Sequence, residues 1–213
     1  MKKIMLMVAM AVATLTANAQ VYVGGGLGFS SSKKAYVDAD GVTEPDAVTS
    51  FSILPEIGYK LDDKLSVGIQ LGFTTTSFGD IEFEGVDLKD VKSTGFSIAP
   101  YARYTFVKWG KVGLFADAQF AYTHTSTKGD YPIGNDNVIE CEETENEWSL
   151  GIIPGLSFDV NEKITLITKV GWLGYSSAKP EYKIGDEKRK YKASSNFGLN
   201  LTNNVEFAVF YNF

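Results

Sequence analysis

Residues 65–74 read Leu-Ser-Val-Gly-Ile-Gln-Leu-Gly-Phe-Thr. Every odd position holds a large apolar side chain, and every even position holds glycine, serine, threonine or glutamine. Because successive side chains of a β-strand point to opposite sides, the stretch predicts one strand with an apolar face and a small, polar face. About 10 residues are also enough to cross a bilayer as a tilted strand.

The same alternation recurs along the chain, and the connections between the alternating runs differ in length. It recurs in residues 51–61, 96–106, 112–123, 148–159 and 164–172. Tight turns are expected at 62–64, 108–111 and 161–163, and long polar loops at 31–50, 77–93, 126–146 and 177–193. A soluble β-sandwich also alternates, but short turns on one rim and long loops on the other are typical of outer-membrane β-barrels.

Aromatic residues gather at the ends of the expected strands, as they do in the two interfacial girdles of membrane barrels. Near the turns these residues are Tyr59, Tyr104, Phe106 and Trp109, and near the loops they are Phe73, Tyr122, Trp148 and Trp172. The sequence therefore predicts an all-β fold: an eight-stranded antiparallel transmembrane β-barrel, an up-and-down meander with short periplasmic turns and four long extracellular loops.

A short repeat marks three of the expected strands. Residues 53–59, 98–104 and 152–158 share an aliphatic residue, a proline two positions later and a closing aromatic residue. Since proline lacks a backbone donor and is usually found at edges or bulges, we expect bulges at Pro55, Pro100 and Pro154.

The closing segment allows two strand counts. Apolar residues keep odd parity from Phe197 to Phe213, which predicts one long eighth strand. A turn at residues 202–204 would instead give nine strands. Because single-chain bacterial barrels have an even number of strands, we expect eight.

The beginning of the chain has the pattern of a cleaved signal peptide. Lys2 and Lys3 precede an apolar run over residues 4–15, and Ala17-Asn18-Ala19 is a small-x-small cleavage site. We therefore expect a signal peptide at residues 1–19 and one barrel domain at 20–213.

Without the two lysines, the mature chain has 18 basic and 26 acidic residues. This net charge of -8 argues against nucleic acid as a partner. The single cysteine, Cys141, excludes an internal disulfide.

The last nine residues, VEFAVFYNF over 205–213, alternate and end in an aromatic residue. With this ending and the architecture above, residues 21–213 resemble the small outer-membrane β-barrel family that includes the membrane domain of outer-membrane protein A. The resemblance implies an integral protein of the Gram-negative cell outer membrane. It also implies that the barrel-assembly machinery recognises a C-terminal signal formed by Phe207, Val209, Tyr211 and Phe213. Members of this family are structural proteins, adhesins, stress-related surface proteins or, rarely, enzymes.

Charged residues fall at positions whose parity points into the barrel. An eight-stranded barrel is only wide enough for side chains to fill, and unpaired buried charges are costly. We therefore expect a mutually paired interior network, with a polar path for ions or small solutes as the alternative. Its expected members are Glu56, Arg103, Asp117, Asp159, Lys169 and Glu206.

The third and fourth expected loops have opposite charge. The acidic residues of the third are Asp130, Asp136, Glu140, Glu142, Glu143 and Glu145, and the basic residues of the fourth are Lys179, Lys183, Lys188, Arg189, Lys190 and Lys192. We expect the two loops to attract each other across the mouth. Alternatives are an extracellular ligand at the loops, divalent cations at the acids, or lipopolysaccharide phosphates at the basic loop.

One possible catalytic group remains. His124 and Ser126 lie on the outer wall at the loop end of a strand, and the pair resembles the lipid A deacylase barrels, in which the histidine would activate the serine. Glu140 would then orient the histidine. Because two residues match often by chance, the favoured interpretation is a non-enzymatic structural or surface-interaction protein without metal or cofactor. A narrow pore or passive transporter is the second interpretation, and a lipid A hydrolase the third.

Overall fold

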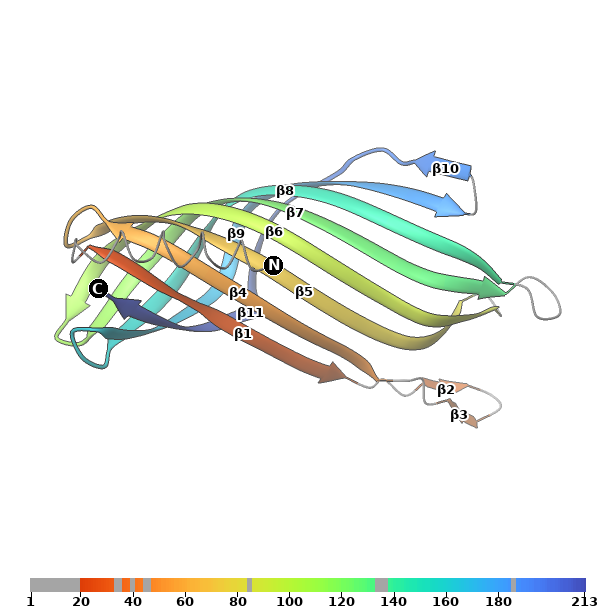
Figure 1. Ribbon diagram of the computed structural model, residues 1–213, viewed down its shortest axis with the longest axis horizontal. Coiled ribbons are helices and arrows are strands. Elements are labelled where there is room, and N and C mark those ends of the chain that lie inside the picture. Colours follow the sequence, from red (N-terminus) through yellow and green to blue (C-terminus); the bar gives the residue numbers. More distant parts are fainter. Residues whose placement is uncertain are drawn as a thin grey trace, which may run out of the picture.

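Eight long antiparallel strands form a closed barrel in the computed structural model (Figure 1). The structure describes residues 20–32, 36–38, 41–43, 47–83, 86–132, 138–184 and 187–213. Each strand pairs with the next along the chain, and the last pairs with the first, so the predicted eight-stranded meander is confirmed. The barrel strands are β1 (Val21–Ser32), β4 (Val48–Lys60), β5 (Leu65–Phe83), β6 (Val86–Trp109), β7 (Val112–Pro132), β8 (Val138–Asp159), β9 (Ile164–Ile184) and β11 (Ser194–Asn212).

Three short strands lie outside the barrel wall. β2 (Tyr36–Asp38) and β3 (Gly41–Thr43) pair with each other in the connection between β1 and β4. β10 (Glu187–Lys190) pairs with the upper part of β9. Among the described residues there is no helix of the length and apolarity needed to span a membrane. The expected signal peptide at 1–19 lies outside the described residues and stays a prediction.

Three tight turns lie at one end of the barrel, here called the turn end. Asp62 Oδ1 accepts hydrogen bonds from the backbone N–H groups of Lys64 and Leu65, at 2.7 Å each. Asn161 Oδ1 accepts the equivalent pair from Lys163 and Ile164. These side chains close the turn in place of a backbone acceptor. In the third turn Gly110 adopts φ +56°, a conformation that favours glycine.

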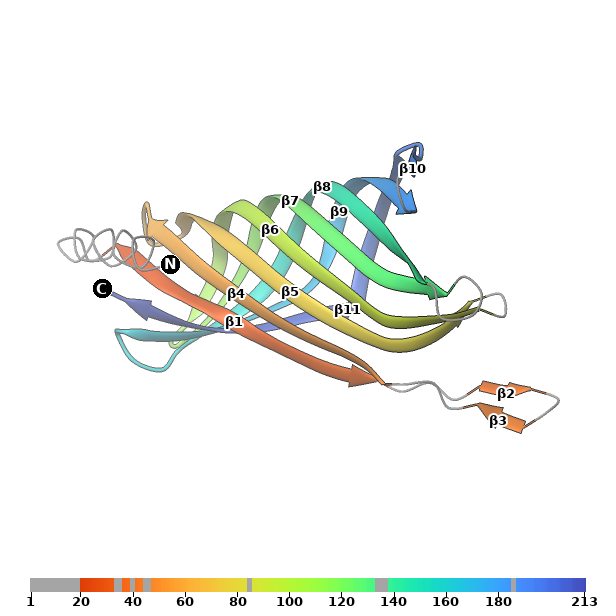
Figure 2. The same cartoon turned by 45° about the vertical axis from the view of Figure 1, so that its right-hand side comes forward.

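The opposite end, the loop end, differs from the expectation. Residues 77–93, 126–146 and 177–193 were expected to be polar loops, but most of them continue the strands: β5 runs to Phe83, β7 to Pro132 and β9 to Ile184. These segments are rich in β-branched and hydroxyl residues, and Ser93 and Thr127 bond across the ladder. At the loop end the strands from β5 to β9 continue beyond the ends of β1 and β4, and these extensions are here called the wall (Figures 1 and 2).

The outer surface of the barrel is apolar, and exposed aromatic side chains lie near both ends of the barrel. Phe73 contacts Phe96, and Trp148 contacts Tyr175, with ring centroids 5.2 Å apart in each pair. Tyr104, Phe106 and Trp109 are exposed near the turn end.

The placement of Trp172 in this girdle is wrong. Between the paired positions Ile152–Leu173 and Gly155–Lys169, β9 has one residue more than β8. Gly171 in this interval has φ +74°, and the extra residue reverses the parity of β9. The Trp172 indole therefore lies inside, against Gly151 and Gly174.

The prolines behave in two ways. Pro154 lies at this register shift between β8 and β9, as expected. The bulges expected at Pro55 and Pro100 are wrong, because Ile53–Phe73 and Glu56–Gln70 keep one register, as do Ile98–Tyr122 and Tyr101–Gln119. At these two positions the ladder only skips pairs, since a missing donor can be tolerated without an inserted residue.

The closing strand is one element, so the nine-stranded alternative is wrong. β11 shifts register against β9 between Asn200 and Val205 without a turn. On both sides of the shift the outward residues are exposed, as in Phe197 and Leu199 above it and Phe207 and Val209 below it.

Aromatic rings and glycines fill the barrel interior in cross-strand pairs. The ring of Tyr22 covers Gly58, that of Tyr101 covers Gly68, and that of Phe115 covers Gly155. In each pair the glycine is the register partner of the aromatic residue, so a side chain in its place would collide with the ring. The narrow lumen is thereby packed at side-chain density.

Candidate functional site

A cluster of charged side chains crosses the middle of the lumen. Arg103 donates two hydrogen bonds to Asp117, from Nε to Oδ1 at 2.7 Å and from Nη2 to Oδ2 at 2.8 Å. Its Nη2 also reaches Glu56 Oε1 at 3.2 Å. A bidentate guanidinium–carboxylate pair fixes both side chains in one geometry.

Lys169 connects the remaining acids. Together the charged side chains form what is here called the ion cluster: Glu56, Arg103, Asp117, Lys169 and Glu206. Its Nζ lies 2.8 Å from Glu56 Oε2, 3.7 Å from Asp117 Oδ2 and 3.6 Å from Glu206 Oε1. Gln70 Nε2 donates to Glu206 at 2.9 Å and to Glu56 at 3.3 Å. Each carboxylate thus has at least one charged or amide donor.

The ion cluster joins strands from all sides of the barrel. Its members come from β4, β6, β7, β9 and β11, and the side chains of Arg103, Glu56, Asp117 and Lys169 are at most 7% exposed. The Phe115 ring lies under the Arg103 guanidinium, 4.3 Å from its Cζ. Because buried charges are tolerated only when they are paired, these contacts explain how five charged side chains fit in the lumen. The lumen is filled with protein at this level.

Asp159 does not belong to the ion cluster, which corrects the expectation for that residue. It is the last residue of β8, at the turn end, where Lys108 Nζ lies 2.9 Å away and Thr165 Oγ1 donates at 2.8 Å. Its side chain is one-third exposed. Parity gave the direction of the side chain, but its position at the strand end places it below the ion cluster.

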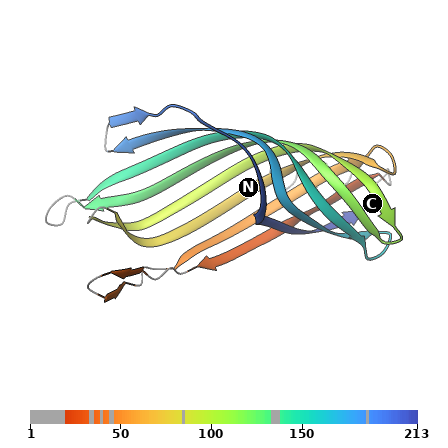
Figure 3. The ribbon, with the colours of Figure 1, turned by 180° about the vertical axis from the view of Figure 1, so that it is seen from behind.

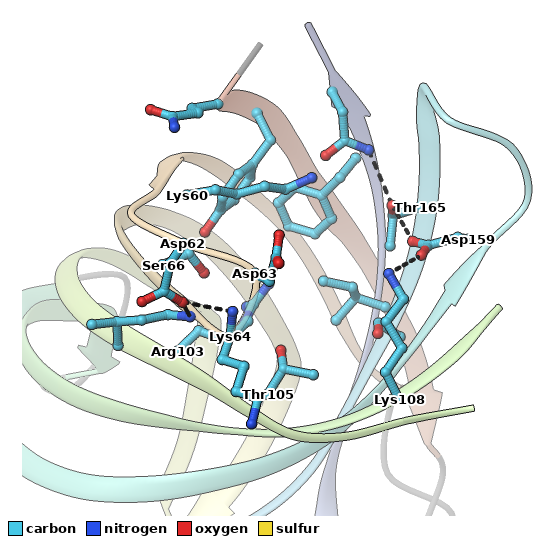
Figure 4. Close-up of a pocket in the computed structure, with 17 residues that line it drawn as sticks. Lys60, Asp62, Asp63, Lys64, Ser66, Arg103, Thr105, Lys108, Asp159 and Thr165 are labelled. Atoms are coloured by element: carbon cyan, nitrogen blue, oxygen red, sulfur yellow. Dashed lines mark hydrogen bonds and ion pairs between the residues drawn. The ribbon is translucent and has the colours of Figure 1, made fainter. Parts of the chain in front are cut away.

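A pocket of about 330 Å³ opens at the turn end below the ion cluster (Figure 4). Lys60, Lys64, Asp62 and Asp63 line its rim, and Arg103 lies among its inner residues. Basic and acidic groups both surround the pocket, and it extends as far as the ion cluster. Turn residues 62–64 line it, although their sequence predicts only a tight turn.

The residues proposed as a catalytic group are not assembled. His124 Nδ1 lies 2.8 Å from Asn146 Oδ1, and Ser126 Oγ donates to Glu142 Oε1 at 3.0 Å. Among the hydrogen bonds of the described side chains, none joins His124 to Ser126; the side chain of Glu140 is outside that set. Residues two apart on one strand face are separated by about 7 Å, and each of these two side chains bonds a residue of the neighbouring strand β8 instead.

The acidic and basic segments of the wall lie on adjacent strands. Glu142 is the register partner of Lys183, whereas Lys190 Nζ lies 3.2 Å from Glu181 Oε1 within the basic segment itself. The Tyr182 hydroxyl bonds Glu143, which raises the pKa of this phenol to about 12. The two segments therefore lie side by side as paired strands, and the expected attraction between their charges stays a prediction. The side chains of Asp130 and Asp136 lie outside the described ones.

The residues of the expected assembly signal lie on the last strand and just beyond it. Phe207, Val209 and Tyr211 are exposed on the outer face of β11. The ring of Phe213 contacts that of Tyr211 at 5.1 Å. They form an apolar outer stripe at the end of the chain.

Comparisons with known proteins agree with this architecture. Solved structures with a similar fold include the translocator domain of the autotransporter NalP from Neisseria meningitidis, at 14% identity and a TM-score of 0.52, over 93% of this chain and 67% of that chain. Neisserial surface protein A matches at 15% identity and a TM-score of 0.43, over 92% of this chain and 98% of that chain. The outer membrane protease OmpT from Escherichia coli matches at 9% identity and a TM-score of 0.47, over 90% and 94%.

At 14% identity the NalP domain supports the fold alone, and the two matches with TM-scores below 0.5 add nothing to that. No curated protein matches the sequence. The model of the outer membrane protein beta-barrel domain matches residues 4–213, nearly the whole chain. The chain belongs to this family of outer-membrane β-barrels, and it is an integral protein of the outer membrane.

Proposed function

We propose that this protein is a non-enzymatic surface protein of the outer membrane, whose working part is the wall of paired strands above the membrane. The observation that carries this proposal is the ion cluster, which fills the lumen at mid-height with side chains at most 7% exposed, Glu206 apart. A filled lumen argues against a passive transporter. It leaves the wall from β5 to β9, with β10 at its edge, as the surface available to partners.

The enzymatic alternative has less support. A serine nucleophile needs a base within hydrogen-bonding reach. His124 and Ser126 instead bond Asn146 and Glu142 on the neighbouring strand. Incubation of the refolded protein with lipid A, followed by mass spectrometry, tests this alternative directly, and release of an acyl chain would favour it.

The chemistry of the wall favours a phosphate-bearing partner. Lys188 and Lys192 are exposed in and just beyond β10, and β10 has an outer edge with no partner among the described strands. The phosphates of lipopolysaccharide surround an outer-membrane protein at this height and carry the complementary charge. We therefore propose lipopolysaccharide as the partner of the basic edge, and the barrel-assembly machinery as a transient partner of the outer stripe of β11.

The test compares two charge-matched variants. Lys188→Gln/Lys192→Gln removes two positive charges at the loop end, and Lys64→Gln/Lys163→Gln removes two at the turn end. Binding of purified lipopolysaccharide to detergent-solubilised protein is measured at rising salt. The first variant should bind more weakly and with a smaller salt dependence, and the second should match the wild type. Equal binding by both variants would contradict the proposal for the basic edge.

A further inference from the structure

The first and last strands of the barrel pair over only part of their length. β1 and β11 pair from Tyr22–Asn212 to Gly26–Ala208. The same register would place Leu27 opposite Phe207 and Phe29 opposite Val205, but in these described residues β1 and β11 do not pair with each other. A Cβ built on Gly28 would meet only the Ser52 side chain of β4 and no atom of β11. We call the interval between Leu27–Phe29 and Val205–Phe207 the seam.

Above the seam the two strands diverge. β1 continues to pair with β4 up to Ser32–Val48, and β11 continues to pair with β9 up to Ser194–Ala178. Figures 2 and 3 show β11 turning away from β1 toward β10. Each strand is therefore held on one side only in this part of the barrel.

Irregularities on the neighbouring strands account for the divergence. The β8–β9 register shifts between Ile152 and Gly155, beside Gly171 with φ +74°. From Asn200 to Val205, β11 advances five positions while β9 moves only from Trp172 to Val170. Bulges bend a strand and increase its twist, so two adjacent shifts direct the upper part of β11 away from β1.

The seam lies within the membrane-crossing part of the barrel. β1 has 12 residues, close to the length that crosses a bilayer, so Leu27–Phe29 lie in its outer half. Unpaired backbone groups in hydrocarbon cost several kcal/mol each unless a polar group satisfies them. The seam therefore favours an occupant that has a hydrogen-bonding group as well as an apolar part.

The two sides of the seam differ in chemistry. Leu27, Phe29 and Phe207 face outward and are 73%, 74% and 68% exposed, among the highest values for apolar residues in the barrel. The inner side has only small or polar side chains, with Gly26 and Gly28 on β1 and Glu206 on β11. An occupant therefore meets hydrocarbon-like groups outside and polar groups inside.

Glu206 lies next to the last paired residues of β1 and β11, where the seam begins. Its Oε1 is 3.7 Å from the position of a Cβ built on Gly26, and its side chain is 21% exposed, against 7% or less for the other charged members of the ion cluster. Gln70 and Lys169 bind Oε1 of this carboxylate, and the part of the side chain that stays exposed lies beside Gly26. A hydrogen-bond donor on the occupant matches this acceptor.

We propose that the seam is a lateral binding site for a long-chain amphiphile, which enters from the outer leaflet with its chain between Leu27 and Phe207 and a hydroxyl-type donor toward Glu206. The ion cluster below stops the molecule from passing toward the turn end. This site is separate from the strand extensions of β5 to β9 that are proposed above to bind partners. It would operate whether or not the wall binds lipopolysaccharide.

The inward indole of Trp172 provides a reporter for the site. The chain has three tryptophans, so Trp109→Phe/Trp148→Phe leaves Trp172 alone inside the lumen. Trp109→Phe/Trp172→Phe leaves Trp148, which faces the lipid and is 41% exposed. In vesicles, a chain-brominated dodecanol should quench both reporters, because bromine quenches on contact, whereas a chain-brominated phosphatidylcholine should quench only Trp148. If dodecanol quenches Trp148 and leaves Trp172 unchanged, the proposal fails.

A disulfide across the seam tests the route of entry. Leu27→Cys/Phe207→Cys and the matched control Val23→Cys/Tyr211→Cys are made in the Trp172-only protein with Cys141→Ser. The control residues are an existing register pair and differ from the seam positions by two full repeats of the ladder, so both pairs have the same place in its hydrogen-bond pattern. The control should oxidise readily and keep the quenching, and the seam pair should oxidise slowly and lose the quenching once it is locked.

Three further results would overturn the proposal. Equally fast oxidation of both pairs would show that the seam is closed in solution. Quenching that persists in the locked seam variant would show another route into the lumen. Disulfide-linked dimers of a Leu27→Cys single variant at low protein-to-lipid ratio would identify a second copy of the chain as the occupant. The control variant reports whether two added cysteines alone disturb folding.

Discussion

The same kinds of charged side chain form ion pairs in two regions of this barrel, and the surroundings give them opposite importance. Inside, Arg103 and Lys169 hold Glu56 and Asp117 with side chains nearly inaccessible to water. On the wall, Lys190 and Glu181 lie 3.2 Å apart with side chains 74% and 42% exposed. Water screens the outer pair, whereas the inner groups have only one another. Distance alone therefore does not rank these contacts.

The largest expected effect is at Arg103. Arg103→Ala leaves Asp117 and part of Glu56 buried without their donor, which should lower the free energy of unfolding by about 3–5 kcal/mol. Urea unfolding of the refolded protein in vesicles measures the change. The double variant Arg103→Leu/Asp117→Leu removes both charges and should cost much less. A single variant within about 1 kcal/mol of the wild type would show that the ion cluster does not depend on this pair.

The next effect tests the packing below the ion cluster. In Gly155→Ala the new methyl group meets the Phe115 ring, which lies under Arg103, and overpacking of this kind costs about 1–3 kcal/mol. The control is Gly95→Ala, whose methyl group would have its nearest neighbour at 3.6 Å and should be neutral or slightly stabilising. The same unfolding assay compares the two, and equal effects would contradict the ring-on-glycine account.

On the wall, breaking an ion pair should matter little. Lys190→Ala should change the free energy of unfolding by about 0.2–1 kcal/mol, and the difference should disappear at high salt. Measurement in low and high salt separates it from the Arg103 variant, whose effect should persist. A cost near that of Arg103→Ala would remove the distinction between the two regions.

The smallest expected effect concerns a proton on the wall. Tyr182 donates to Glu143, so the pKa of its phenol is raised to about 12. A raised pKa means that the contact contributes stability below pH 10, the ordinary phenol value, and that this contribution is lost as the pH rises through about 12. Ultraviolet titration with Tyr182→Phe as the reference should show one late-titrating phenol, and Glu143→Gln should lower its pKa. An unchanged titration in Glu143→Gln would contradict the assignment.

The features predicted well from the sequence depend on strict alternation. A period of two places every second side chain inside, which gave the barrel, the strand count and the inward direction of Arg103, Asp117 and Lys169. It failed where the backbone gains a residue, as at Gly171, because one inserted position turns Trp172 from the lipid to the lumen. It also gave no height along the barrel, so Asp159 was grouped with an ion cluster that lies above it.

Other features have no signal in a single sequence. Polar composition suggested loops where cross-strand pairing extends β5 to β9, since serine and threonine suit exposed strands as well as loops. The seam depends on where two strands distant in sequence stop pairing, and parity continues unbroken through Leu27 and Phe207. The spacing of His124 and Ser126 suggested chemistry, but their partners on the adjacent strand decide what they bond.

Ion conductance of refolded residues 20–213 in a planar lipid bilayer tests the central claim, that the ion cluster closes the lumen. The account predicts a protein that inserts stably, as shown by protease protection of its strands, and passes no steady current. Well-defined, long-lived channel openings by the inserted wild-type protein would contradict it.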